Sequence, residues 1–142
     1  MLNKRFLLGI FSLIFFLVSI NSAVHAEVVV LVNNSVITED LGLKEIKKIF
    51  LGKKMFWEGN QKITLFILKE SPAHKEFLRQ YLGKSENQFT NYWQQLLFTG
   101  KGMMPQMVSE DLLVETIKQT KGAIGYAPAD ITAEGVKVVK LK

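Results

Sequence analysis

The chain contains no cysteine, and only two of its 142 residues are histidines. The absence of cysteine excludes disulfide bonds, a thiol nucleophile and thiolate metal sites. Only His74 lies beyond the first 26 residues, so a histidine-rich metal cluster, or a Ser-His pair supported by a second histidine, cannot be assembled there. The carboxylates are scattered among lysines, and no spacing singles out an acid and base pair. We therefore expect no enzyme, no metal site and no cofactor.

Long apolar runs are absent after residue 26, but one precedes it. Lys4 and Arg5 make a basic start, residues 6–20 are almost uninterrupted apolar, and residues 24–26 end in a small residue at the usual cleavage spacing. This pattern predicts a secretory signal peptide over residues 1–26, with cleavage after Ala26. A permanent membrane helix is the competing interpretation, but the run is shorter than the roughly 20 residues needed to span a bilayer.

The remaining residues, 27–142, suit one exported domain. The whole chain has a formal net charge of +5, and loss of Lys4 and Arg5 lowers that charge to +3. Because basic and acidic residues are mixed along the chain, this is a mild preference for anions and no nucleic-acid signature. We expect no nucleic-acid partner and no membrane insertion after signal cleavage. Without disulfides the domain must be held by its core, which a domain of about 115 residues can supply.

Strand and helix patterns alternate along these residues. Apolar and β-branched runs predict strands at residues 27–33 and 62–68 and two short strands at 123–127 and 136–141. Capping residues and terminal glycines predict four helices, which begin near Asp40, Ser71, Ser85 and Ser109. We expect the third of these helices, which carries Phe89, Tyr92, Trp93, Leu96 and Leu97, to form the centre of the core. The stretch 100–108 is expected to be a flexible loop.

The predicted order is β-α-β-α-α-α-β-β. Strands that alternate with helices favour right-handed crossovers and parallel pairing. The order therefore predicts a single three-layer α/β domain with a mainly parallel sheet.

The junction between the second strand and the second helix is the strongest candidate for a binding site. Ser71 and Pro72 are typical of an N-cap and a first helical residue. A helix N-terminus presents unpaired N–H groups and attracts oxyanions, and Ser71 could add its hydroxyl and Lys69 its charge. Plain capping, worth about 1 kcal/mol, explains the same residues and is favoured from the residues alone. Similarly, an exposed polar residue is the simpler interpretation of His74, and a role at the helix start is the alternative.

Four segments carry a family resemblance: ITEDLGLKEIKKIFLGKKMFWEGN, KITLFILKES, YWQQLLFTGKG and KGAIGY. In this order they resemble the phosphate-binding protein family of phosphate ABC transporters, and more closely the short, single-domain members of that periplasmic binding protein superfamily. The resemblance extends from about Val28 to Ala127. It implies a type 2 periplasmic binding protein fold, in which two α/β lobes enclose a ligand. Residues 27–142 correspond to only one such lobe.

The resemblance also implies a site. In full-length relatives the equivalent junction carries an Arg and then Ser-Gly-Thr at the helix start. Ser71 matches that Ser, whereas Pro72 and Ala73 replace the Gly and Thr, and Lys69 is an approximate substitute for the Arg. Pro72 removes a backbone donor, Ala73 removes a hydroxyl, and a lysine is a point charge instead of a bidentate fork. We expect Ser71, Lys69, Ala73 and His74 to bind an oxyanion weakly and without selectivity.

Two functions follow as hypotheses. The first is a periplasmic protein that binds phosphate or a similar oxyanion and is a solute-binding component linked to phosphate ABC transport, with an ABC permease as partner. The second is an interaction module of the same fold that has lost its ligand and binds another envelope protein. Its adaptable apolar surface would comprise Phe56, Trp57, Met103, Met104 and Met107. The simpler interpretation of Trp57 is that it covers the core.

Overall fold

The computed structural model describes residues 27–102 and 104–141. The predicted signal peptide and Met103 lie outside these described residues. The strands are β1 (Val28–Val32), β2 (Asp40–Leu41), β3 (Thr64–Leu68), β4 (Gln106–Val108), β5 (Ala123–Pro128) and β6 (Lys137–Leu141). The helices are α1 (Leu43–Phe50), the 3₁₀ turn η1 (Glu58–Asn60), α2 (Pro72–Phe77), the π-helical turn η2 (Leu78–Leu82), α3 (Glu86–Phe98) and α4 (Glu110–Gln119). Across the described part of the chain, no helix combines the length and the apolar character needed to cross a membrane.

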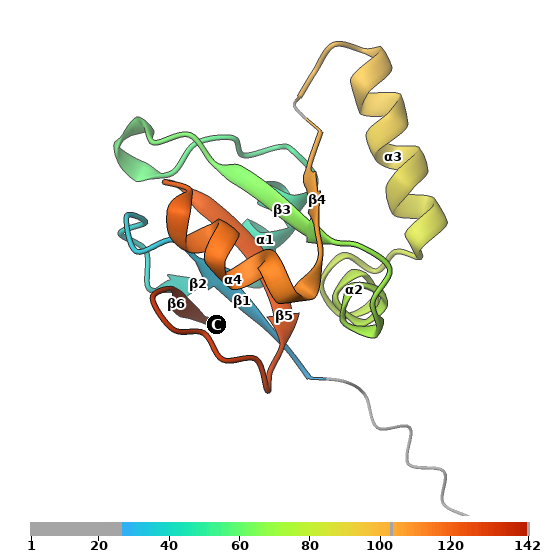
Figure 1. Cartoon of the computed structure of the whole chain (residues 1–142). Helices are drawn as coiled ribbons and strands as arrows, with labels where there is room; N and C mark the ends of the chain where they lie inside the picture. The colour runs from blue at the N-terminus through green and yellow to red at the C-terminus, as the bar shows by residue number, and fades with distance from the viewer. Residues whose placement is uncertain (1–26, 103, 142) are drawn as a thin grey trace, which may run out of the picture.

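The strands form one six-stranded sheet in the order β2-β6-β1-β5-β3-β4 (Figure 1). β1 is antiparallel to both of its neighbours, β5 and β6, whereas the remaining pairs are parallel. Five of the six strands thus point the same way, and the predicted mainly parallel sheet is confirmed. The apolar run of β1 fits its central place, because a strand covered on both faces shows no polar alternation.

Both edge strands differ from the sequence predictions. Asp40, predicted as a helix cap, lies in β2, and the N-cap of α1 is Gly42, which has no side chain to cap with. Residues 106–108, predicted as part of a flexible loop, form β4 beside β3. Strands of two or three residues are too short to show a periodic pattern, and both depend on hydrogen bonds to a neighbour distant in sequence.

Helices cover both faces of the sheet, which confirms the three-layer prediction. Consecutive residues of a strand point to opposite faces, and β5 illustrates the result. A Cβ placed on Gly125 would lie 3.0 Å from Ile117 Cδ1, so α4 packs closely on that face. The next residue, Tyr126, faces the other layer, where its ring stacks on Phe77 of α2 with 3.8 Å between centroids. α1 lies on the same side, since the Phe50 ring is 5.6 Å from that of Tyr126.

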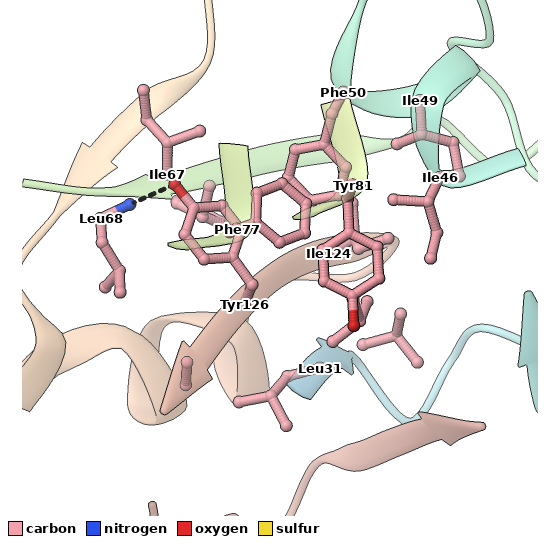
Figure 2. Packing of buried hydrophobic residues seen from close by; sticks show 14 of the residues in the cluster. Leu31, Ile46, Ile49, Phe50, Ile67, Leu68, Phe77, Tyr81, Ile124 and Tyr126 are labelled. Atoms are coloured by element: carbon pink, nitrogen blue, oxygen red, sulfur yellow. Dashed lines mark hydrogen bonds between the residues drawn. The ribbon is translucent and has the colours of Figure 1, made fainter. Parts of the chain in front are cut away.

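The centre of the core lies where β1 and β5 meet these helices. Figure 2 shows the rings of Phe50, Phe77 and Tyr126 packed together, with Ile124 and Leu31 beside them. All five of these side chains are fully buried. Asn33, at the end of β1, ties the other layer to the sheet because its side-chain amide donates to Ile117 O and Lys118 O at the end of α4, each at 2.8 Å.

The prediction that α3 forms the centre of the core is wrong. The helix stands at the side of the molecule beyond β4 (Figure 1), and only Phe89 and Trp93 are buried along it. Phe98 is 92% exposed. The predicted start of the helix near Ser85 is confirmed, because Ser85 is its N-cap and forms a capping box with Gln88. An apolar face identifies what a helix can bury, but not which surface it meets.

Candidate functional site

The candidate site lies where β3 ends and α2 begins. The backbone N–H of Lys69 donates to Val108 O at 2.9 Å, so the last residue before the turn is held by β4. Glu70 then turns the chain with a positive φ of 21°, and Ser71 returns to extended backbone as the N-cap of α2. The site therefore sits at the carboxyl end of a parallel strand, a usual place for ligands in open α/β sheets.

The first turn of α2 has fewer available donors than an ordinary helix start. The Ser71 hydroxyl oxygen accepts from His74 N–H at 3.1 Å, and Pro72 is the first helical residue and has no N–H. The predicted capping role of Ser71 and Pro72 is confirmed. The amide of Ala73 remains in the first turn, where an N–H has no acceptor within the helix. The Ser71 hydroxyl proton also remains available, because an accepting hydroxyl can still donate.

His74 is buried, with only 8% of its surface exposed, so the interpretation of an exposed polar residue is wrong. Its Nδ1 lies 2.5 Å from the Tyr126 hydroxyl, and that hydroxyl oxygen also accepts from Leu68 N–H at 3.3 Å. The hydroxyl proton can therefore be donated to Nδ1, which makes neutral His74 with its proton on Nε2 the fitting tautomer. The link joins three elements at one point: β3, α2 and β5 (the Leu68 bond is drawn in Figure 2).

Burial controls the protonation of this pair. Burial lowers the pKa of His74 below its ordinary value of 6.5, and the charge of Glu86 opposes the shift more weakly. Burial likewise raises the pKa of Tyr126 far above its usual value. Both shifts favour the neutral forms, as expected where desolvation penalises a charge. The helix start therefore rests on a neutral hydrogen-bonded pair and gains no cation from His74 near neutral pH.

A shallow hollow of about 460 Å³ opens in front of the helix start. It is lined by Glu70, Ser71, Pro72, Lys75 and Glu86. Lys75 Nζ lies 3.6 Å from Glu86 Oε2, so the cation nearest to Ser71 in this hollow already has an acidic neighbour. Of the predicted residues, the structure brings Ser71 to the hollow and places Ala73 and His74 behind it, both buried. Lys69 is exposed and does not line the hollow.

Sequence reasoning missed three participants. Tyr126 is separated from His74 by 52 positions, and the GAIGY segment drew attention only as a family signal. Glu86 is 11 positions from Lys75 in the sequence and becomes its neighbour only through the fold. Glu70 is one of many acidic residues scattered along the sequence, and only the fold shows that it lines the hollow. For Glu70 a signal was available, because it directly follows Lys69 in the sequence. Within the described residues no cluster of three or more histidines and carboxylates is positioned to hold a metal ion.

Comparison with known proteins gives structural matches only. No family model matches the chain, and no curated protein matches its sequence. Among solved structures, PstS from Borrelia burgdorferi aligns with a TM-score of 0.64 and 12% identity, over 81% of this chain and 47% of that one. A candidate phosphate ABC transporter substrate-binding protein from Clostridium perfringens, solved with bound phosphate, aligns with a TM-score of 0.59 and 16% identity, over 80% and 44%.

A third match is an ABC-type phosphate transport receptor from Vibrio cholerae, with a TM-score of 0.54 and 13% identity, over 80% of this chain and 45% of that one. These neighbours are substrate-binding proteins rather than enzymes. This chain spans less than half the length of each of them. The protein therefore has the fold of one part of the phosphate ABC transporter substrate-binding proteins, as the sequence resemblance implied.

Proposed function

We propose that the protein is an exported, single-lobe relative of phosphate receptors that binds phosphate or a similar oxyanion weakly at the start of α2. The observation that carries the proposal is the position of Ser71, at the carboxyl end of β3 and the first turn of α2, in a fold that phosphate-binding proteins share. The Ser71 hydroxyl supplies the direct donor, and the buried amide of Ala73 behind it contributes the positive end of the first helical turn. Lys69 supplies charge from outside the hollow, and His74 holds the helix start from beneath through Tyr126.

Weak binding follows from the same geometry. Glu70 and Glu86 line the hollow with Ser71, and each carboxylate repels an anion. The hollow is open to water, which screens every charged contact, whereas a site closed between two lobes would strengthen them. We expect a dissociation constant in the millimolar range, equivalent to about 4 kcal/mol. A second subunit, an ABC permease or another envelope protein that covers the hollow would tighten it. This covered state is the proposed link to phosphate transport in the periplasm.

Thermal stability in phosphate tests the proposal, with sodium chloride of equal ionic strength as the reference. A ligand that binds only the native state stabilises it, and phosphate at ten times the dissociation constant adds about 1.4 kcal/mol. Sulfate in a parallel titration reports selectivity. No stabilisation by either anion at tens of millimolar would contradict the proposal.

Variants at Ser71 separate ligand binding from capping. Asn and Asp both cap helices about as well as Ser, so Ser71→Asn and Ser71→Asp preserve the first turn of α2. Ser71→Asp adds a negative charge where the anion would sit, and we expect it to abolish the phosphate effect. Ser71→Asn should retain part of it, and Lys69→Gln should reduce it. If phosphate stabilised Ser71→Asp and the wild type equally, the anion would not bind at this helix start.

The second candidate function is the protein-interaction module. Three of the side chains predicted for such a surface are exposed: Phe56 by 46%, and Met104 and Met107 by 57% each. Trp57 does not contribute, because it is 4% exposed and its Nε1–H donates to Gly122 O at 2.9 Å, which confirms that it covers the core. A photo-crosslinking residue at position 107, in the edge strand β4, should capture a specific envelope protein. A photo-crosslinking residue at position 140, in β6 near the opposite edge of the sheet, should not. A monomer without crosslinks at position 107 would exclude this role.

A further inference from the structure

A second cavity separates α3 from the body of the domain. Its volume is about 410 Å³, and its lining residues come from four segments: α1, the stretch before β3, β3 itself and α3 with the following loop. The apolar walls include Ile49, Met55, Phe56, Leu65 and Trp93. None of the residues of the Ser71 hollow lines this cavity. We call it the α3 cleft.

At one end of the α3 cleft the helix packs closely against glycines. A Cβ on Gly52 would lie 2.8 Å from the Trp93 ring and 3.2 Å from Leu96 Cδ2. A Cβ on Gly102 would lie 3.3 Å from the same Leu96 atom. The inner face of α3 is therefore seated against two glycines, and Tyr92 fixes it through a hydroxyl that donates to Leu51 O at 2.6 Å. These contacts anchor the helix without filling the space beside the indole.

The lining of the α3 cleft combines apolar walls with positive charge. Lys54 and Lys62 line it, and of the described lining residues none is Asp or Glu. Neither lysine is isolated, because Lys54 Nζ lies 2.6 Å from Glu45 Oε2 and Lys62 also interacts with another group of the protein. Exposed Lys53 and Lys101 adjoin lining residues in sequence and add to the positive field. A mostly apolar pocket of roughly 300–1,000 Å³ with a few polar groups is typical of small-molecule sites.

The Trp93 indole in the wall of the cleft also has an unpaired donor. Its Nε1–H is buried and has no hydrogen-bond partner among the described residues. Buried polar groups are nearly always paired, so an orphan donor is unusual. Apolar cavities of about 150 Å³ are large enough to bind benzene, and the α3 cleft is larger.

We propose that the α3 cleft binds a small amphipathic anion, with an aromatic or branched aliphatic body and one carboxylate. The body lies against Trp93, Leu65 and Phe56, and the carboxylate lies towards Lys54 and Lys62. The charge of the lining selects an anion over a neutral molecule of the same shape. This ligand class differs from the inorganic oxyanion proposed for Ser71, and the two sites share no residue.

Tryptophan resonances provide the test, with 4-phenylbutyrate and the uncharged 4-phenylbutan-1-ol as a matched pair of probes. The residues after 26 contain two tryptophans, and only Trp93 lines the cleft. Each indole gives one N–H signal in a ¹H–¹⁵N spectrum, and Trp93→Phe assigns them. We expect 4-phenylbutyrate to shift the Trp93 signal saturably at millimolar concentration and to leave the Trp57 signal in place. The alcohol should bind at least threefold more weakly.

Two variants locate the site. Lys54→Met with Lys62→Met keeps the stems and removes both charges, and should weaken 4-phenylbutyrate binding at least threefold while binding of the alcohol is unchanged. Lys140→Met is the control, because Lys140 lies in β6, near the opposite edge of the sheet. It should change the binding of neither probe. Leu65→Trp should fill the cleft and abolish binding of both probes. No shift of Trp93 at 10 mM, or equal binding of acid and alcohol in both wild type and the double variant, would overturn the proposal.

Discussion

Removal of the Tyr126 hydroxyl is the sharpest test of the network beneath the helix start. Tyr126→Phe preserves the ring that stacks on Phe77 and deletes one oxygen. That oxygen accepts from Leu68 N–H at 3.3 Å and lies 2.5 Å from His74 Nδ1. The variant therefore leaves two buried polar groups without this partner. Such an orphan costs about 1–3 kcal/mol, and the long Leu68 bond falls at the lower end. We expect a total loss of about 2–4 kcal/mol.

Urea unfolding at pH 7.5 measures this loss as a change in the free energy of unfolding. Tyr92→Phe is the matched control, because it also removes one tyrosine hydroxyl, which in this case donates to Leu51 O in a half-buried position. There water can replace the lost partner, and we expect less than about 1 kcal/mol. Losses below 0.5 kcal/mol for Tyr126→Phe, measured with an error of about 10%, would show that the His74–Tyr126–Leu68 link does not stabilise the fold.

Three further predictions concern protonation, backbone conformation and the fastening of α4. Burial lowers the pKa of His74 in the folded state, so the contribution of neutral His74 to stability is complete above the unfolded-state pKa of about 6.5 and decreases as the pH falls towards the folded-state pKa. The free energy of unfolding should therefore drop between pH 7.5 and pH 5.5. His74→Asn should make this pH dependence weaker. Gly122 has a φ of +73°, and a Cβ there would lie 2.1 Å from Lys62 O, so Gly122→Ala should lower the free energy of unfolding in urea by more than about 2 kcal/mol. Gly59 has a similar φ of +79°, but a Cβ there would meet nothing within 4 Å. Gly59→Ala is therefore the control and should lower that free energy by about 1 kcal/mol. Asn33→Ala removes one buried and one partly buried hydrogen bond to the end of α4 and should speed amide exchange in α4 selectively. Equally faster exchange across the whole domain would refute this local role.

Local chemistry was the part of the structure that could be predicted from the sequence. Ser71 with Pro72, and Ser85 with Gln88, cap their helices as expected because capping depends on residues three positions apart. Gly83 ends the second helical run with a left-handed φ of 62° for the same local reason. The three-layer, mainly parallel architecture followed from the order of elements.

Long-range partners could not be predicted. The buried His74 has a hydrogen-bond partner in Tyr126, and nothing near His74 in the sequence reveals that partner. The outlying position of α3 could not be predicted because its apolar residues fit a core helix equally well. Nothing in the sequence connects α3 with Gly52, the distant glycine on which Trp93 and Leu96 pack. Of the candidate site, the sequence predicted the helix start at Ser71, whereas the acidic residues that line the hollow with it are brought there by the fold. Anion binding by these residues stays a prediction.

The amide resonances of the first turn of α2 test the central proposal most directly. In a ¹H–¹⁵N titration with sodium phosphate at constant ionic strength, the account predicts saturable shifts of Ala73 and its neighbours, with a millimolar midpoint that disappears in Ser71→Asp. Small linear shifts that sodium chloride reproduces, with Ala73 no different from amides elsewhere in the domain, would contradict it.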